Sequence, residues 1–205
     1  MKNIKYFFLL LIFTMTINTS YSQSIGLGIE GGVNIANISV TPDQTTSSRT
    51  GIIIGGIVDI NISKNFTIAP GIRFNMKGFS TTVNGVTYTD KLNYLEIPAL
   101  IKVKFPLTEV KPYIIGGPVV GFRISANEEQ SNGVNSQTVD ASSAYESIDF
   151  GLIFGGGLDF KVASKTELFI QPAYCLGLSN IWKQSTTVTV KNNGFQITGG
   201  VKFLL

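Results

Sequence analysis

Hydrophobic and polar residues alternate with a period of two along most of the chain that follows residue 22. This alternation, bounded by Gly, Asn, Ser and Pro, is typical of β-strands, and the 3.6-residue spacing of amphipathic helices is almost absent. The pattern therefore predicts an all-β protein. The eight expected strands are Ile25 to Asn37, Thr50 to Asn61, Phe66 to Lys77, Leu92 to Phe105, Pro112 to Arg123, Ile148 to Val162, Glu167 to Ser179 and Gly194 to Phe203.

The predicted strands are long, and each has one apolar face. Most have ten or more residues, whereas strands of globular proteins usually have ~5 to 6 and tilted membrane strands ~9 to 11. In the last strand, Phe195, Ile197 and Val201 share one face, and Gln196 and Lys202 lie on the other. Such faces also fit a soluble β-sandwich with a wet outer side. Strand length favours a membrane barrel.

The links between predicted strands alternate in length. The long links are Ile38 to Arg49, Gly78 to Lys91, Ser125 to Ser147 and Asn180 to Asn193, and short links stand between them. In an up-and-down meander the odd links lie at one end and the even links at the other, and outer-membrane barrels have short periplasmic turns and long external loops. We therefore expect an eight-stranded antiparallel up-and-down transmembrane β-barrel with both ends of the barrel domain on the periplasmic side. A soluble periplasmic sandwich or lipocalin-like carrier is the alternative fold.

Aromatic residues gather at the ends of the predicted strands, where membrane barrels carry girdles at the lipid interfaces. Near the short links, the expected inner girdle is Phe66, Phe105, Tyr113, Phe160 and Phe203; the expected outer girdle is Phe74, Phe150, Phe195 and Trp182. The alternative is that these are ordinary core aromatics.

The first 22 residues have the composition of a secretory signal peptide. Lys2 and Lys5 precede an apolar run from Tyr6 to Phe13, and small residues stand at Ser20 and Ser22. A spanning helix needs ~20 apolar residues, and polar residues interrupt this run from Thr14 onward. The expected organisation is a signal peptide over 1–22, cleaved on export, and an outer-membrane barrel over 23–205.

Composition narrows the chemistry of the expected barrel. Without Lys2 and Lys5, 14 basic residues stand against 13 acidic ones, a charge of +1 that does not suggest a nucleic-acid partner. Cys175 is the only cysteine, so neither an internal disulfide nor a cysteine metal site is expected. The sequence has no His, the commonest general base and metal ligand. We expect no cofactor, no metal and no catalytic residues.

Charged residues alternate onto the polar face of the predicted strands, six acids against six bases. They are Glu30, Asp59, Glu96, Asp149, Asp159 and Glu167, with Arg73, Lys77, Lys102, Lys104, Lys161 and Lys202. Side chains just fill an eight-stranded barrel, so buried charges there must pair or be wetted. We expect structural ion pairs in the lumen; a proton or ion relay is the alternative.

Two features complicate the strand assignment. Pro70, Pro98, Pro118 and Pro172 fall inside predicted strands, where each removes a ladder donor, so bulges or local breaks are expected. Gly26 to Gly31 matches the spacing G-x-G-x-x-G, but a nucleotide site needs a following helix and a strand follows here. A glycine-rich bend in a narrow barrel explains this motif better.

Several motifs together resemble the outer-membrane β-barrel domain family often labelled porin-family or PorT-like. They are Tyr94 to Pro98, Pro112 to Ile114, Gly116 to Pro118, Asp149 to Leu152, Gly155 to Leu158 and Tyr174 with Gly177 to Ile181. The resemblance covers the chain after the predicted signal and implies an eight-stranded barrel. A few relatives serve a protein-secretion apparatus, and barrels of this kind commonly end in an aromatic residue, whereas Phe203 is third from the end here.

The leading functional hypothesis is a non-enzymatic outer-membrane barrel with a structural, surface-binding or secretion-accessory role. A narrow pore for small solutes is the alternative, and a lipid-modifying enzyme is a third hypothesis, weakened by the missing His. Expected partners are outer-membrane lipid, the barrel assembly machinery and secretion or extracellular partners of the long loops. The polar segment Ser125 to Ser147 is either a solvated loop or a recognition surface.

Overall fold

The computed structural model describes residues 24–105 and 109–205, and this part of the chain is all-β. The predicted signal peptide lies outside the described residues. The strands are β1 (Ile25–Thr41), β2 (Ser47–Asn61), β3 (Phe66–Val83), β4 (Val86–Lys104), β5 (Val110–Ser131), β6 (Ser136–Asp140), β7 (Ile148–Ala163), β8 (Thr166–Gly177) and β9 (Thr189–Leu204). In the described residues, no helix is long and apolar enough to cross a membrane.

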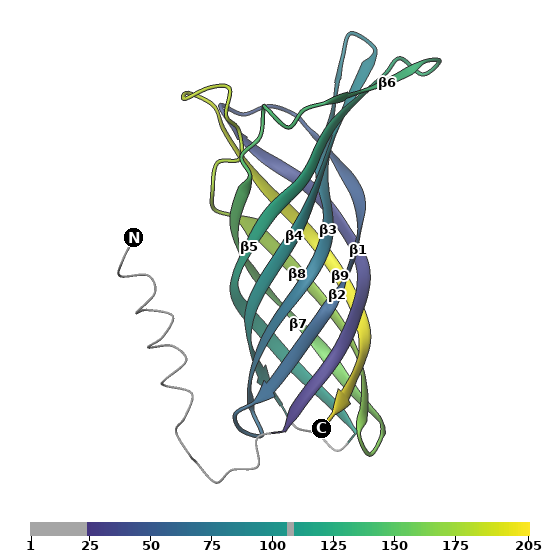
Figure 1. Ribbon diagram of the computed structural model, residues 1–205, viewed down its shortest axis with the longest axis vertical. Helices are drawn as coiled ribbons and strands as arrows, with labels where there is room; N and C mark the ends of the chain where they lie inside the picture. Colours follow the sequence, from purple (N-terminus) through teal and green to yellow (C-terminus); the bar gives the residue numbers. More distant parts are fainter. Residues whose placement is uncertain (1–23, 106–108) are drawn as a thin grey trace.

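Eight of these strands close into an antiparallel barrel (Figure 1). The ring closes where β1 pairs with β9, from Gly26 opposite Leu204 to Thr41 opposite Thr189. The short β6 stays outside the ring and pairs only with β5, as part of a hairpin that projects beyond the barrel. The predicted eight-stranded up-and-down barrel is confirmed, and the start of β1 and the end of β9 lie together at the end with the short turns.

All eight predicted strands form, but several extend further from the short turns than expected. β3 and β4 continue to a turn at Asn84 and Gly85, whose φ angles are 51° and 79°. Two successive residues in this left-handed region are typical of a type I′ hairpin turn, for which Asn-Gly is the preferred pair. Most of the predicted loop from Gly78 to Lys91 is therefore strand. The predicted loop from Ser125 to Ser147 likewise contains the end of β5 and all of β6.

The alternation of polar and apolar residues inverts along the barrel. In its lower part, Ile29, Val33 and Ile35 of β1 are exposed on the outside, and Glu30 and Asn34 are buried inside. Above residue 36 the inward residues Ile38 and Val40 are apolar, and the outward residues Asn37 and Ser39 are polar. The same change occurs in β4 near Asn93 and in β9 near Asn193. An apolar band suited to lipid thus ends here, and a water-facing extension rises above it.

The four strand prolines interrupt the barrel without displacing its register. Pro70 pairs with Ala99 in the same register as Arg73 with Glu96, three residues further along. Register shifts occur elsewhere, between Ser48 and Ile53 and beside Tyr94 and Lys161. The prolines therefore make local breaks rather than bulges.

Candidate functional site

The lower half of the lumen is filled by a cluster of three acids and three lysines, which we call the lower charge cluster. Its members are Asp59, Lys102, Lys104, Asp159, Glu167 and Lys202, all buried. Asp59 on β2 forms ion pairs with Lys102 of β4, at 2.7 Å, and with Lys202 of β9, at 3.0 Å. Lys202 also forms an ion pair with Asp159 of β7, at 2.7 Å. These pairs link strands that are not neighbours in the ring, so the side chains cross the lumen.

A second cluster of Arg73, Lys77, Glu96 and Asp149, the upper charge cluster, lies nearer the external end. Glu96 is fully buried and pairs with Arg73 at 2.8 Å and with Lys77 at 2.7 Å. Lys77 also contacts Asp149 at 3.2 Å. Arg73 donates to Gln196 of β9, and Asn75 of β3 donates to Glu96. Each cluster contains equal numbers of acidic and basic side chains. Their mutual attraction offsets the free-energy cost of removing these charges from water.

Glu30 lies between the two clusters, at a void of about 10 Å³ that Arg73 and Lys102 also line. A space of this size holds about one water molecule. The structure thus places every predicted lumen charge in the interior except one. Lys161 is exposed at the rim, next to the β7–β8 turn and a register shift, where its long side chain reaches water. Glu167 pairs with Lys202 at 3.5 Å and with Lys111 at 2.7 Å. The strand pattern missed Lys111 because this residue stands at the start of β5.

Tyr113 was expected in the inner aromatic girdle, but it lies inside the lumen with 2% of its surface exposed. Its hydroxyl donates to Gln171 at 3.2 Å, and Lys102 lies over its ring, 5.3 Å from the centroid. A Cβ atom at Gly157 would stand 2.4 Å from this ring, so glycine at 157 makes room for it. Tyr113 therefore fills the interior of the barrel, whereas the sequence suggested that its ring contacts lipid.

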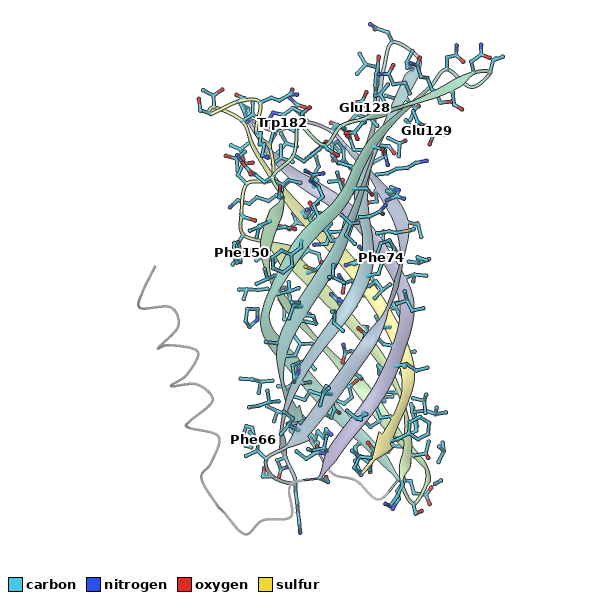
Figure 2. All side chains as sticks on the ribbon, in the orientation of Figure 1. Phe66, Phe74, Glu128, Glu129, Phe150 and Trp182 are labelled. Carbon is cyan, nitrogen blue, oxygen red and sulfur yellow. The ribbon has the colours of Figure 1, made fainter. Side chains whose placement is uncertain are left out.

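The other expected girdle residues face outward, apart from Trp182. Phe66, Phe105 and Phe203 are exposed near the short turns, and Phe150 and Phe195 are exposed higher up. Phe74 and Phe160 are half-buried on the outer face. Phe74 and Phe150 lie near mid-height and Phe66 near the lower end (Figure 2). Trp182 lies above them and packs edge-to-face on Tyr145 with 5.2 Å between ring centroids, because the external loops fold inward over the mouth.

An apolar plug closes the external end above the charge clusters. It contains Ile38, Val40, Leu92, Tyr94, Ala126, Ala144, Tyr145, Ile181 and Val190. The loop residues Tyr145 and Ile181 have 1% and 0% of their surface exposed. Arg123 holds one loop by donating to the backbone carbonyls of Ser142, Tyr145 and Glu146. The loops that follow β6 and β8 are thus anchored in the barrel mouth.

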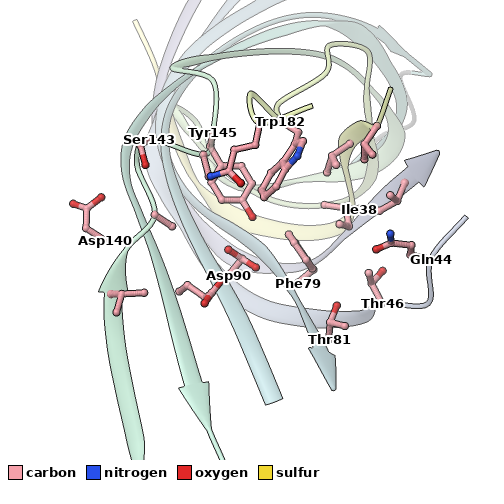
Figure 3. A pocket seen from close by; sticks show the side chains of 18 residues that line it. Ile38, Gln44, Thr46, Phe79, Thr81, Asp90, Asp140, Ser143, Tyr145 and Trp182 are labelled. Carbon is pink, nitrogen blue, oxygen red and sulfur yellow. The ribbon is translucent and has the colours of Figure 1, made fainter. Parts of the chain in front are cut away.

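Beside this plug lies an external pocket of about 470 Å³ (Figure 3). Its aromatic wall contains Phe79, Tyr145 and Trp182, and aliphatic residues of β1 and β9 continue that wall. Asp90 of β4 and Glu128 of β5 also line the pocket, directly opposite each other in the strand register. The site therefore combines aromatic and aliphatic side chains with acidic ones.

Asp90 is the most buried acid of this pocket, with 7% of its surface exposed. It lies beyond the apolar outer band. Burial raises the pKa of Asp90 to about 6, the Tyr145 hydroxyl acts to lower it, and the nearby Glu128 adds to the rise. The carboxyl group therefore changes charge in a mildly acidic range. The described residues contain no cluster of three or more His, Cys, Asp or Glu arranged to hold a metal ion.

Comparison with known proteins matches the fold to outer-membrane barrels. No curated protein sequence matches the chain. Neisserial surface protein A is 13% identical, with 88% of this chain and 96% of that chain covered and a TM-score of 0.53. OprG from Pseudomonas aeruginosa is 10% identical, with coverage of 92% and 99% and a TM-score of 0.50. A major outer membrane protein from Thermus thermophilus is 9% identical, with coverage of 88% and 99% and a TM-score of 0.53.

At identities of this size the likeness shows a shared fold only. The roles of those proteins are not transferred to this chain. A family model for the outer membrane protein beta-barrel domain matches residues 21–183, which is most of the chain. The family match indicates an outer-membrane location. The chain belongs to the outer membrane protein beta-barrel domain family.

Proposed function

We propose that this protein is a non-enzymatic, surface-binding barrel, exported through a cleaved signal peptide, that presents its external pocket outside the cell. The observation that carries the proposal is the contrast between the two ends of the lumen. Ion pairs cross the membrane part, whereas the external extension holds a pocket of about 470 Å³ beside anchored loops. Pockets of ~300 to 1,000 Å³ are typical of small-molecule sites.

The closed lumen also weighs against the alternative of a solute pore. Lys77 of β3 reaches Asp149 of β7 across the ring, and the void at Glu30 measures about 10 Å³. Open aqueous channels occur in barrels of about 16 to 18 strands. A secretion-accessory role is compatible with the proposal, because the same external loops and projecting β5–β6 hairpin could contact a partner.

Planar-bilayer recording of the refolded monomer tests the closed lumen. We expect no stable, porin-sized current, and vesicles that contain the protein should not take up sugar-sized solutes. A variant with Lys77→Ala and Asp149→Ala removes an ion pair that crosses the lumen and serves as a comparison for leakage. A persistent large current from wild-type monomer would contradict the proposal and make transport the leading function.

Cysteine labelling of intact cells tests whether the pocket end faces outward. Val134, in the turn between β5 and β6, is 89% exposed, and Lys64 lies in the short turn at the opposite end. A membrane-impermeant maleimide should label Val134→Cys in intact cells and Lys64→Cys only after lysis. Wild-type protein gives the background, because its one cysteine, Cys175, is buried. The reverse labelling pattern would place the pocket in the periplasm and contradict the proposal.

A further inference from the structure

We propose that the external pocket binds a small organic cation, an ammonium group carried on an apolar body. The inference rests on the proposed surface-binding function and names the ligand class of that same pocket. It follows from three features of the site: an unmatched pair of acids, an aromatic wall beside them, and a volume suited to a small molecule.

Asp90 and Glu128 face each other on neighbouring strands and both line the pocket. Like charges directly opposite each other destabilise a sheet. Among the described residues neither carboxylate takes part in an ion pair, although Gln130 donates to Glu128 at 2.8 Å. The adjacent acid Glu129, by contrast, pairs with Lys91. The outward acid therefore has a basic partner in the chain, whereas the inward pair lacks one.

Among the described residues, no Lys or Arg lines the pocket. Arg123 of β5 donates to three backbone carbonyl groups of the adjoining loop, and Lys183, next to Trp182, pairs with Glu146 at 3.6 Å. Asp90 is more than nine-tenths buried and lines the cavity, with the Tyr145 hydroxyl as its polar neighbour. A ligand cation would supply the countercharge that the described residues do not.

The aromatic wall beside the acids suits the apolar body of such a ligand. Tyr145, Trp182 and Phe79 lie around the same cavity as Asp90 in Figure 3. Aromatic faces attract ammonium groups and bury hydrocarbon as well. Asp140, the third acid at the edge, is exposed and accepts the backbone N–H of Ser142 at 2.7 Å. Two acids and an aromatic wall thus favour an organic cation over a bare metal ion, which prefers a shell of oxygen ligands.

The probe for the test is 2-phenylethylammonium, with neutral 2-phenylethanol and anionic 3-phenylpropanoate as its comparisons. The full barrel is refolded into phosphatidylcholine vesicles, and each probe is titrated near neutral pH. Trp182 is the only tryptophan in the chain and lines the pocket, so its fluorescence reports binding directly. We expect saturable binding of the ammonium probe, at least about tenfold tighter than binding of the alcohol, and no saturable binding of the carboxylate.

Charge-removing variants then locate the binding site. Asp90→Asn and Glu128→Gln should each weaken ammonium binding, the former by about tenfold or more. Glu129→Gln is the matched control, because this acid neighbours Glu128 but pairs with Lys91 outside the pocket. Equal affinity of wild-type protein for the ammonium and the alcohol would overturn the inference, as would unchanged ammonium binding by folded Asp90→Asn protein.

The two proposals fail in different ways. Heat-dependent gel mobility and circular dichroism report folding of each variant, and the comparison of the three probes on wild-type protein does not depend on any variant. A large bilayer current would defeat the surface-binding function, whatever the ammonium result. A closed barrel that does not prefer the ammonium probe would leave that function standing and overturn the ligand class alone.

Discussion

Lys77 on β3 and Asp149 on β7 form an ion pair across the interior of the barrel, with 3.2 Å between Nζ and the nearer carboxylate oxygen. β4 and β5 separate these two strands in the ring. Lys77 also holds Glu96 at 2.7 Å, so one ammonium group neutralises acids from two sides of the lumen. The pair therefore spans the lumen and helps to fill it.

Replacing Lys77 by Ala should destabilise the barrel by about 3 kcal/mol, because the change leaves Glu96 and Asp149 buried with less positive charge. Urea unfolding of the refolded protein, followed by circular dichroism, measures the loss. Lys91→Ala is the control: its ion pair with Glu129 is partly exposed, and we expect a change of about 1 kcal/mol or less. Equal losses in the two variants would mean that the upper charge cluster does not stabilise the lumen.

A charge on the lipid-facing surface should also be unfavourable. Ile101 is 54% exposed and lies within the apolar outer band of β4. Ile101→Arg should destabilise the barrel by about 2 to 4 kcal/mol in lipid vesicles. Val134→Arg, in an exposed turn, should leave the free energy of unfolding nearly unchanged. Equal tolerance of arginine at the two positions would contradict the assignment of this face to lipid.

Much of the fold could be predicted from the sequence because a membrane barrel repeats one simple pattern. In the lower part of β1, β4 and β9, polar residues point inward and apolar residues outward, and the period of two is enough to find these strands. The same alternation also predicted most of the charges that enter the lumen. Lys161 was assigned wrongly because a strand pattern does not show where the rim allows a long side chain to reach water.

The external site could not be predicted in the same way. Its strands continue past the lipid band with the opposite phase, so that the apolar residues Ile38 and Val40 point inward. The strands expected from the sequence end where this pattern changes. The Asn84-Gly85 pair is the exception, because Asn-Gly is the preferred sequence of a tight hairpin turn and predicts the turn between β3 and β4. Asp90 lies opposite Glu128 because of the β4–β5 register. Trp182 packs over the mouth of the barrel because its loop contacts the loop that carries Tyr145. Neither is a local property of the chain.

The packing of Tyr113 predicts a position-specific effect of alanine at glycine sites. At Gly157 a new Cβ would stand 2.4 Å from the Tyr113 ring and 2.6 Å from the carbonyl oxygen of Ile170. Gly157→Ala should therefore destabilise the barrel by about 1 to 3 kcal/mol. Gly116→Ala is the control, since nothing lies within 4 Å of its added Cβ. If urea unfolding gives the same free energy for both variants, the lumen is looser around Tyr113 than the contacts imply.

Ammonium binding should strengthen as pH rises through the range in which Asp90 ionises. Burial raises the pKa of Asp90 to about 6, with Glu128 opposite adding to the rise and the Tyr145 hydroxyl opposing it. About one tenth of an acid with this pKa is ionised near pH 5, whereas nearly all of it is ionised near pH 7.5. Because the carboxylate form attracts the cation, affinity for 2-phenylethylammonium should fall about tenfold between the higher and the lower pH. Trp182 fluorescence titrations across this range measure the effect, and Asp90→Asn should flatten the profile. A wild-type affinity that is constant with pH, or a slope that persists in Asp90→Asn, would show that Asp90 does not provide the countercharge.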